Sequence, residues 1–273
     1  AAALPSGPHP EQDAAVANQQ GPLLIVAGPG TGKTRTLVER IARLLREGLA
    51  EPSEITAITF TRRAARELRE RLAALLGKPA QGVAVQTFHS LGLDLLRKHA
   101  VAAGLPDDFK VLDESARQAL LAQVVEARGE KPSARLANNI SASKAALLTP
   151  VELAEVFRDY QAALASAGAV DFDDLVGRTV QLLETREEIL GDARRRCRHL
   201  LVDEYQDINA AQYRLIRLLA PADSLFCAVG DPDQAIYGFR GSDPKYFGCF
   251  GTDYPTARTI TLVRNYRSHA PIV

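Results

Sequence analysis

A short segment near the amino terminus constrains the possible folds of this chain more than any other feature. Four branched apolar residues, Leu23 to Val26, follow Pro22 and lead into the turn Gly28-Pro29-Gly30-Thr31-Gly32-Lys33-Thr34. An apolar run bounded in this way predicts a buried strand. Apolar residues then recur at helical spacing, at Leu37, Val38, Ile41, Leu44 and Leu45. A strand, a glycine-rich turn ending in Lys-Thr and an amphipathic helix are typical of a phosphate-binding loop.

The residue types of this loop suit a nucleoside triphosphate. Glycines allow backbone N–H groups to surround phosphate oxygens, and the helix N-terminus adds a partial positive charge. Lys33 would reach the β- and γ-phosphates, and the Thr34 hydroxyl would hold Mg²⁺. Ala27 stands where the usual pattern has its first glycine. The alternative is an ordinary flexible turn between a strand and a helix.

Further apolar runs predict a parallel sheet. Five more strands are expected at residues 54–60, 83–86, 199–202, 225–229 and 258–263. Helical periodicity alternates with these runs, which predicts an α/β fold with helices on both faces of the sheet. Ligands of such sheets bind at the carboxyl ends of the strands. Chemically suggestive side chains follow the predicted strands there: Lys33, Thr61, His89, Asp203, Glu204 and Gln234.

The middle of the chain has a different pattern. Between residues 103 and 168 we find helical periodicity, at 116–128, 134–147 and 150–165, and no convincing strand. A block of this kind inside an alternating pattern predicts an inserted all-α subdomain.

The second half of a nucleotide site is predicted at the fourth strand. Asp203 follows an apolar strand, where a carboxylate behind Mg²⁺ belongs, and Glu204 could polarise the attacking water as a general base. Gln234 could sense the γ-phosphate through its amide. The alternatives are an acidic helix cap for the Asp-Glu pair and a plain turn around Gln234.

Several motifs together resemble the UvrD/Rep/PcrA branch of superfamily-one helicases. They are Asp203-Glu204-Tyr205-Gln206-Asp207, Ile58 to Ala65, Thr87-Phe88-His89-Ser90, Val229 to Gly241, and Asn265-Tyr266-Arg267-Ser268. The motifs occur in the family's order over nearly the whole chain. The resemblance implies a P-loop NTPase with a RecA-like parallel sheet flanked by helices.

The same resemblance implies roles around the nucleotide, with ATP and Mg²⁺ as cofactors. Gln12 matches the glutamine that contacts adenine, and Arg35 and Tyr266 match the pair that sandwiches the base. Arg267 matches an arginine finger for the transferred phosphoryl group. Gln234 matches the glutamine that couples the γ-phosphate to the DNA-contact motif.

Single-stranded DNA is the expected polymer, bound through aromatic stacking and backbone charge. The candidates for stacking are Phe60, Tyr237 and Phe239, and those for phosphate contact are Thr61, Arg62, His89 and Arg240. The family often has tryptophan at the position of Phe239. Alternatives remain: Phe60 and Phe88 as core, Phe239 packed under its own loop, His89 as a helix cap, and the arginines from Arg62 to Arg71 as a solvated face.

The resemblance also predicts a domain division. Residues 1–102 and 169–267 would form the first RecA-like motor domain, 103–168 the helical insertion, and 268–273 the start of a second motor domain that this chain lacks. The family's full enzymes move 3′ to 5′ along single-stranded DNA and unwind duplex junctions. Alternatives are a nucleotide-dependent DNA-binding or interaction module without motor activity, the motor half of a nuclease-fused helicase, and a small-molecule P-loop kinase.

Composition limits which partners and which cellular compartment are expected, and two clusters of charged residues have structural interpretations. The formal net charge is zero, so a polyanion must bind through local patches. The chain has three cysteines, Cys197, Cys227 and Cys249, which are too few for a disulfide framework or a zinc site. No apolar run is long enough to span a bilayer. We therefore expect a cytoplasmic protein. The basic run Arg194 to Arg198 is expected to end a helix. Asp171, Asp173 and Asp174 could bind a metal, but helix capping is the preferred interpretation.

Overall fold

A parallel sheet forms the centre of the larger part of the molecule. The computed structural model describes residues 9–234 and 241–266. Within these residues six strands pair in the order β3-β2-β6-β7-β1-β8, and every pair is parallel. The strands are β1 Leu23–Ala27, β2 Ile55–Thr59, β3 Ala84–Thr87, β6 His199–Val202, β7 Cys227–Gly230 and β8 Arg258–Leu262. All six predicted strands are therefore confirmed, with small differences at their ends.

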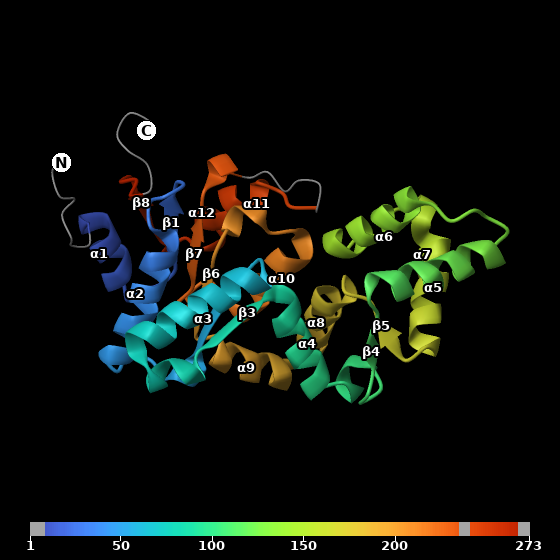
Figure 1. Cartoon of the computed structure of the whole chain (residues 1–273), viewed down its shortest axis with the longest axis horizontal. Coiled ribbons are helices and arrows are strands. Elements are labelled where there is room, and N and C mark those ends of the chain that lie inside the picture. Colours follow the sequence, from blue (N-terminus) through green and yellow to red (C-terminus); the bar gives the residue numbers. More distant parts are fainter. Residues whose placement is uncertain (1–8, 235–240, 267–273) are drawn as a thin grey trace.

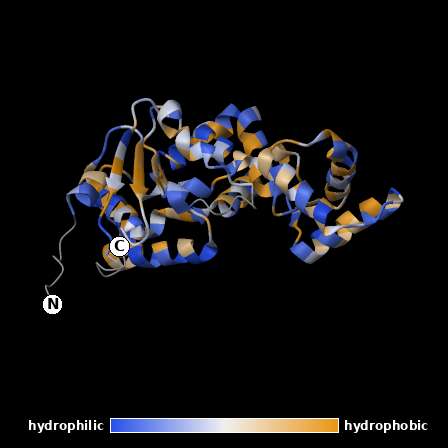
Figure 2. Cartoon of the chain, turned by 90° about the horizontal axis from the view of Figure 1, so that it is seen from above, coloured by the Kyte–Doolittle hydropathy of each residue, from blue (hydrophilic) through white to orange (hydrophobic). Residues whose placement is uncertain are grey.

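Helices cover both faces of the sheet, as the sequence predicts. One face carries α1 (Pro10–Ala17), α2 (Lys33–Arg46) and α3 (Arg62–Leu76), which bury residues such as Leu37, Ile41 and Leu68 against the strands. The other face carries α4 (Phe88–Lys98), α8 (Asp174–Thr185), α9 (Glu187–Arg196) and α10 (Ala210–Leu219). Figure 2 shows the apolar strands between helices whose outer sides are hydrophilic. Full burial of each large apolar side chain contributes about 1.5–3 kcal/mol, which is what holds the layers together.

A helical part lies beside the sheet at the far end of the molecule (Figure 1). It contains α5 (Glu114–Ala127), α6 (Ala134–Ala146) and α7 (Ala154–Ser166). These helices enclose a separate apolar cluster that includes Val125, Ile140, Tyr160 and Leu164. The three predicted helices of the inserted segment are confirmed.

The expectation that the inserted segment lacks strands is wrong in one place. β4 (Lys110–Val111) pairs in parallel with β5 (Ala169–Val170) where the chain enters and leaves the helical part. Each strand has two residues, which is too short for a period-two pattern to appear in the sequence. The pair holds the two connecting segments side by side.

The carboxyl ends of the six long strands meet at one edge of the sheet, and the chain turns there into the helices and loops that carry the candidate site. α2, α3 and α4 begin within a few residues of the strands that precede them.

The shorter elements are η1 Pro52–Glu54, η2 Lys78–Gly82, η3 Val101–Ala103, η4 Val151–Leu153, η5 Tyr205–Asp207, η6 Pro232–Gln234, α11 Lys245–Gly248 and α12 Phe250–Asp253. None of the helices in the described ranges is long and apolar enough to cross a membrane.

Candidate nucleotide and DNA site

The glycine-rich turn between β1 and α2 is held in shape by a hydrogen bond within the turn. Gly30 and Gly32 have φ values of 75° and 89°, in the left-handed region that glycine adopts without strain. The Thr31 hydroxyl donates to the Gly28 carbonyl at 2.7 Å, and α2 begins directly afterwards at Lys33. The free N–H groups at the start of α2 therefore lie next to the loop, which is the arrangement that binds phosphate.

Gln12 supports the loop from α1. Its Nε2 donates to the Thr31 carbonyl at 2.9 Å, and the side chain is buried. A Cβ atom on Gly32 would lie 2.6 Å from that Nε2, and the φ of 89° is one that residues with a side chain rarely adopt, so glycine suits this position. The residue predicted to contact adenine is thus in direct contact with the phosphate-binding loop.

The two predicted halves of the nucleotide site meet. Lys33 Nζ, at the start of α2, lies 3.1 Å from Glu204 Oε2, just beyond the end of β6. Glu204 has a φ of 52°, a left-handed conformation that is rare for a residue with a side chain. Its N–H donates to Asp203 Oδ1 at 3.0 Å. The strand end therefore presents the Asp203 and Glu204 carboxylates toward the loop that carries Lys33.

The electrostatics of Asp203 fit a bound cation. Burial of the carboxyl group, followed by repulsion from Glu204, raises the pKa of Asp203 to about 6. A carboxylate that is costly to keep charged is stabilised by a nearby divalent ion, and Mg²⁺ prefers oxygen ligands such as this group and the Thr34 hydroxyl. Among the described residues no group of three or more His, Cys, Asp or Glu side chains could hold a metal ion by itself. Such a magnesium site would therefore depend on phosphate oxygens as well.

Gln234 lies on the neighbouring strand end, after β7. Its Nε2 donates a short hydrogen bond to Asp231 Oδ2, while the N–H of Asp233 donates to Asp231 Oδ1 at 3.1 Å. Asp231 is buried, so this turn has a fixed shape. Gln234 therefore lies at the same edge as Lys33 and Glu204.

Gln206 is a residue of this network that sequence reasoning missed. Its side chain is 2% exposed and lies between Glu204 and Asp231. The available signal in the sequence was its position inside the Asp203–Asp207 motif. Burial, and then the charge of Glu204, also raises the pKa of Asp207 to about 6.

The segment after β8 lies on the phosphate-binding loop. Asn265 Nδ2 donates to the Pro29 carbonyl at 2.9 Å, and the N–H of Tyr266 donates to the Gly30 carbonyl at 2.8 Å. Arg35 is exposed in the first turn of α2, and Arg264, not Arg35, approaches the Tyr266 ring, at 5.5 Å from its centroid. Arg267 lies outside the described residues.

The DNA candidates on β2 and α3 also have structural roles. Phe60 is half-buried and meets Phe88 edge to face, with ring centroids 5.7 Å apart. The Thr61 hydroxyl caps α3 by accepting the N–H of Ala64 at 3.0 Å. Arg62 is exposed beside them. Phe88 is a core residue, as its alternative interpretation had it.

His89 stacks on an aromatic ring from a distant part of the chain. Its ring lies parallel to that of Phe172, with centroids 3.9 Å apart and an interplanar angle of 16°. Burial lowers the pKa of His89 to about 4, although Asp173 acts in the opposite direction. The alternative that His89 caps a helix is wrong, because Thr87 and Ser90 form the capping box of α4.

Phe172 is a second residue that the sequence did not single out. It is 46% exposed, which is unusual for phenylalanine, and it lies against a predicted DNA contact. Tyr237, Phe239 and Arg240 lie outside the described residues. The exposed Phe172 ring therefore adds an aromatic surface beside His89, one of the predicted DNA contacts.

Of the acidic group, Asp171 and Asp174 form the capping hydrogen bonds that the sequence favours, whereas Asp173 makes no side-chain cap and instead accepts from Ser141 at 2.6 Å. Asp171 Oδ1 accepts the N–H of Asp174 at 2.9 Å, and Asp174 Oδ2 accepts the N–H of Asp171 at 3.1 Å. Lys144 Nζ lies 2.6 Å from Asp171 and 2.8 Å from Asp174. A single lysine of α6 therefore pairs with two buried carboxylates, an arrangement that the sequence did not predict.

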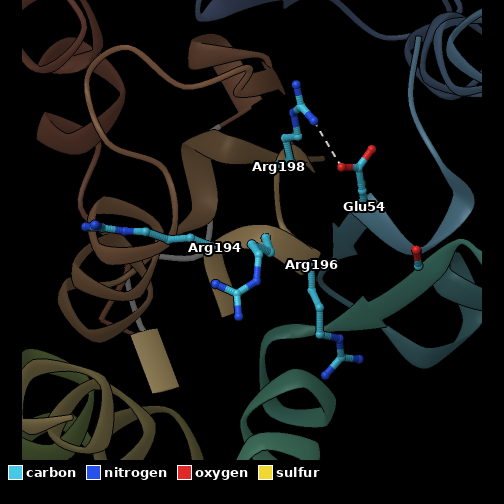
Figure 3. A pocket seen from close by; sticks show the side chains of 6 residues that line it. Glu54, Arg194, Arg196 and Arg198 are labelled. Carbon is cyan, nitrogen blue, oxygen red and sulfur yellow. Dashed lines mark hydrogen bonds and ion pairs between the residues drawn. The ribbon is translucent and has the colours of Figure 1, made fainter. Parts of the chain in front are cut away.

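The basic run Arg194 to Arg198 lines an open cavity of about 560 Å³ with Ser53 and Glu54 (Figure 3). The cavity lies at the amino ends of β2 and β6, at the opposite edge of the sheet from the phosphate-binding loop. Arg198 pairs with Glu54 at 3.1 Å, and Arg194 donates to the Leu218 carbonyl at 2.8 Å. Figure 3 shows the labelled guanidinium groups pointing in different directions. α9 ends at Arg196, so the run ends a helix as predicted.

The fold and the loop define the class of protein: a P-loop protein with a RecA-like parallel sheet. The family model described as the UvrD/REP helicase N-terminal domain matches residues 9–255, and the chain belongs to that family. It is 40% identical over 282 residues to a protein of Leuconostoc citreum described as ATP-dependent DNA helicase PcrA, covering 97% of this chain and 38% of the relative.

Other relatives carry the same description. The PcrA helicase of Staphylococcus aureus strain Mu50 is 40% identical over 280 residues, and that of Bacillus subtilis strain 168 is 38% identical over 281 residues. These alignments cover 96% and 97% of this chain. The chain spans about 38% of the length of the curated relatives it matches.

Proposed function

We propose that this chain is the ATP-binding motor part of a DNA helicase that moves 3′ to 5′ along single-stranded DNA. The observation that carries the proposal is the 3.1 Å contact between Lys33 and Glu204, because it brings the phosphate-binding lysine and a general base to one point. Membership of the UvrD/REP family and likeness to proteins described as ATP-dependent DNA helicases support it. The proposal places the chain in the cytoplasm.

ATP would lie on the loop from Gly28 to Thr34, with its γ-phosphate between Lys33 and Glu204. Glu204 would orient and deprotonate the attacking water, and Gln234 would report the state of the γ-phosphate. Gln12, Arg35 and Tyr266 would surround the base. Arg267 would supply positive charge to the transferred phosphoryl group.

Mg²⁺ would be held by the Thr34 hydroxyl and the Asp203 carboxylate together with phosphate oxygens. A bound magnesium ion neutralises charge on the phosphates during transfer. The raised pKa of Asp203 supports this placement, since the buried carboxylate has no basic side chain bonded to it among the described residues. Thr34 follows Lys33 directly and so faces the same phosphates.

Single-stranded DNA would cross the same edge of the sheet. Phe60, Thr61, Arg62 and His89 lie at the ends of β2 and β3. Tyr237, Phe239 and Arg240, which lie outside the described residues, are further proposed contacts. Stacking on aromatic rings is sequence-tolerant, which suits a protein that moves along DNA. The proposed partners are single-stranded DNA, a duplex junction and a second RecA-like motor domain that would close the ATP cleft.

The proposed division of the chain follows the sequence analysis. Residues 1–102 and 169–267 would move as the motor domain, with 103–168 as the helical insertion and 268–273 leading to the second motor domain. The separate apolar cluster of the helical part supports this division.

ATP turnover with and without single-stranded DNA tests the proposal. The comparison includes this chain, its Lys33→Ala variant and a longer parent protein that carries it. We expect DNA to stimulate turnover, Lys33→Ala to abolish the stimulation, and the chain alone to be slow. DNA binding without any stimulated turnover would instead favour a nucleotide-dependent binding module. Robust duplex unwinding by this chain alone would contradict its assignment as a partial motor.

A further inference from the structure

A buried glutamine joins the two strand ends that face the nucleotide. Gln206 Nε2 donates to Glu204 Oε2 at 2.9 Å, and Gln206 Oε1 accepts the N–H of Asp231 at 2.9 Å. A further contact of Nε2, with Asp207 Oδ2, is 3.3 Å long. The amide nitrogen of Gln206 therefore bonds to the segment that follows β6, and its amide oxygen bonds to the segment that follows β7.

The fit around this amide is tight. Gln206 is 2% exposed, and a Cβ atom on Gly230 would lie 2.6 Å from Gln206 Oε1 and 2.8 Å from the Phe247 ring. Glycine at position 230 is thus what allows the amide to reach the backbone of the next strand end. An asparagine is one methylene shorter and could not span both partners.

The contacts form a continuous series from the phosphate-binding loop to the γ-phosphate candidate. Lys33 bonds to Glu204, Glu204 to Gln206, and Gln206 to Asp231. Asp231 accepts from Gln234 in turn. Among the described residues of this series, the Gln206 side chain alone bonds to both the segment after β6 and the segment after β7.

We propose that Gln206 is a positioning residue that holds the Glu204 carboxylate and links it to the turn carrying Gln234. This inference rests on the proposed function. In the structure, Glu204 Oε2 accepts from both Lys33 and Gln206. A triphosphate attracts Lys33 to its phosphates, and Gln206 then is the donor that keeps Glu204 in place. A movement of the Asp231 turn reaches Glu204 through the same amide.

Gln206→Glu tests the link with little change in shape. The variant keeps an oxygen for the N–H of Asp231 but replaces the donor to Glu204 by a second carboxylate. Gln212→Glu is the matched control, because Gln212 is also buried and its side chain uses its oxygen, accepting the N–H of Asn209 in the cap of α10, with no donor contact to another described residue. Gln206→Leu, which removes both hydrogen bonds, is the second variant.

The readouts are nucleotide affinity, single-turnover ATP hydrolysis, and DNA affinity with and without a non-hydrolysable ATP analogue. In Gln206→Glu we expect hydrolysis to fall about tenfold or more while nucleotide affinity stays within about threefold. We also expect the analogue to stop altering DNA affinity. Circular dichroism and the Gln212→Glu control identify any general loss of folding.

The outcomes separate the two levels of inference. If the unaltered chain neither hydrolyses ATP nor changes its DNA affinity with the analogue, the proposed function fails and the role of Gln206 fails with it. If the unaltered chain does either and Gln206→Glu behaves like Gln212→Glu, only the role of Gln206 is overturned. A folded Gln206→Leu variant with full hydrolysis overturns it as well.

Discussion

Lys144 and Asp171 form an ion pair that solvent does not reach, with Nζ and Oδ2 2.6 Å apart and side-chain exposures of 4% and 0%. Lys144 lies on α6 of the helical part, and Asp171 lies between β5 and α8. Tyr160 of α7 donates to the same carboxylate oxygen at 3.0 Å. One buried carboxylate thus joins the helical part to the turn that carries Phe172.

Replacing Lys144 by methionine should destabilise the protein strongly. The change leaves the carboxylates of Asp171 and Asp174 buried without a counter-charge, which costs about 3–5 kcal/mol in comparable sites. Urea unfolding measures the free energy of unfolding. Lys245→Met is the control: Lys245 pairs with Asp243 but is 61% exposed, so solvent screens the pair and its loss should change the free energy of unfolding little. Equal losses for the two variants would contradict the assigned role of the buried pair.

His89 should make stability depend on pH. Burial lowers its pKa in the folded protein to about 4, so between there and the ordinary value of 6.5 the unfolded chain binds more protons than the folded one. Stability is therefore complete above pH 6.5 and falls as the pH drops toward 4. Because the ring is partly exposed, we expect a loss of about 2 kcal/mol. Unfolding free energies of His89→Gln should show a shallower slope over this range, and an unchanged slope would refute the assignment.

Alanine at Gly32 should disrupt nucleotide binding. Its φ of 89° is strained for alanine, and the new Cβ would lie 2.6 Å from Gln12 Nε2. The loop must then shift, and we expect nucleotide affinity to fall about tenfold or more. Gly48→Ala is the matched control, since Gly48 also has a positive φ, of 64°, but nothing within 4 Å of the added atom. Fluorescent-nucleotide titration should separate the two variants; similar affinities would contradict a specific role of Gly32 in nucleotide binding.

Glu204→Gln should separate nucleotide binding from ATP hydrolysis. Glu204 holds Lys33 at 3.1 Å and must release it to the phosphates, so loss of its charge should leave nucleotide affinity unchanged or higher. If Glu204 is the general base that we propose, its loss should slow hydrolysis by about a hundredfold to ten-thousandfold. Glu152→Gln, an exposed site in the helical part, controls for the charge change. Weaker nucleotide binding with undiminished hydrolysis would contradict the proposed roles of Lys33 and Glu204.

The sequence predicted most of the fold because long apolar runs and helical periodicity carry local information. It predicted the convergence of Lys33 with Glu204 because parallel strands share one edge for their carboxyl ends. It could not predict β4 and β5, since two-residue strands leave no periodic pattern. Gln206, Phe172 and the Lys144 pair were missed for another reason. Their roles depend on contacts between distant segments, such as the stack of Phe172 on His89.

The hydrogen bonds from Asn265 and Tyr266 to the carbonyls of Pro29 and Gly30 fasten the strand end of β8 to the cradle for the phosphates. If this loop binds and hydrolyses a triphosphate as proposed, any shift of the loop would therefore pull on the backbone that follows β8. Asn265 and Tyr266 thus couple the chain that follows β8 directly to the loop at which the proposed hydrolysis would release energy.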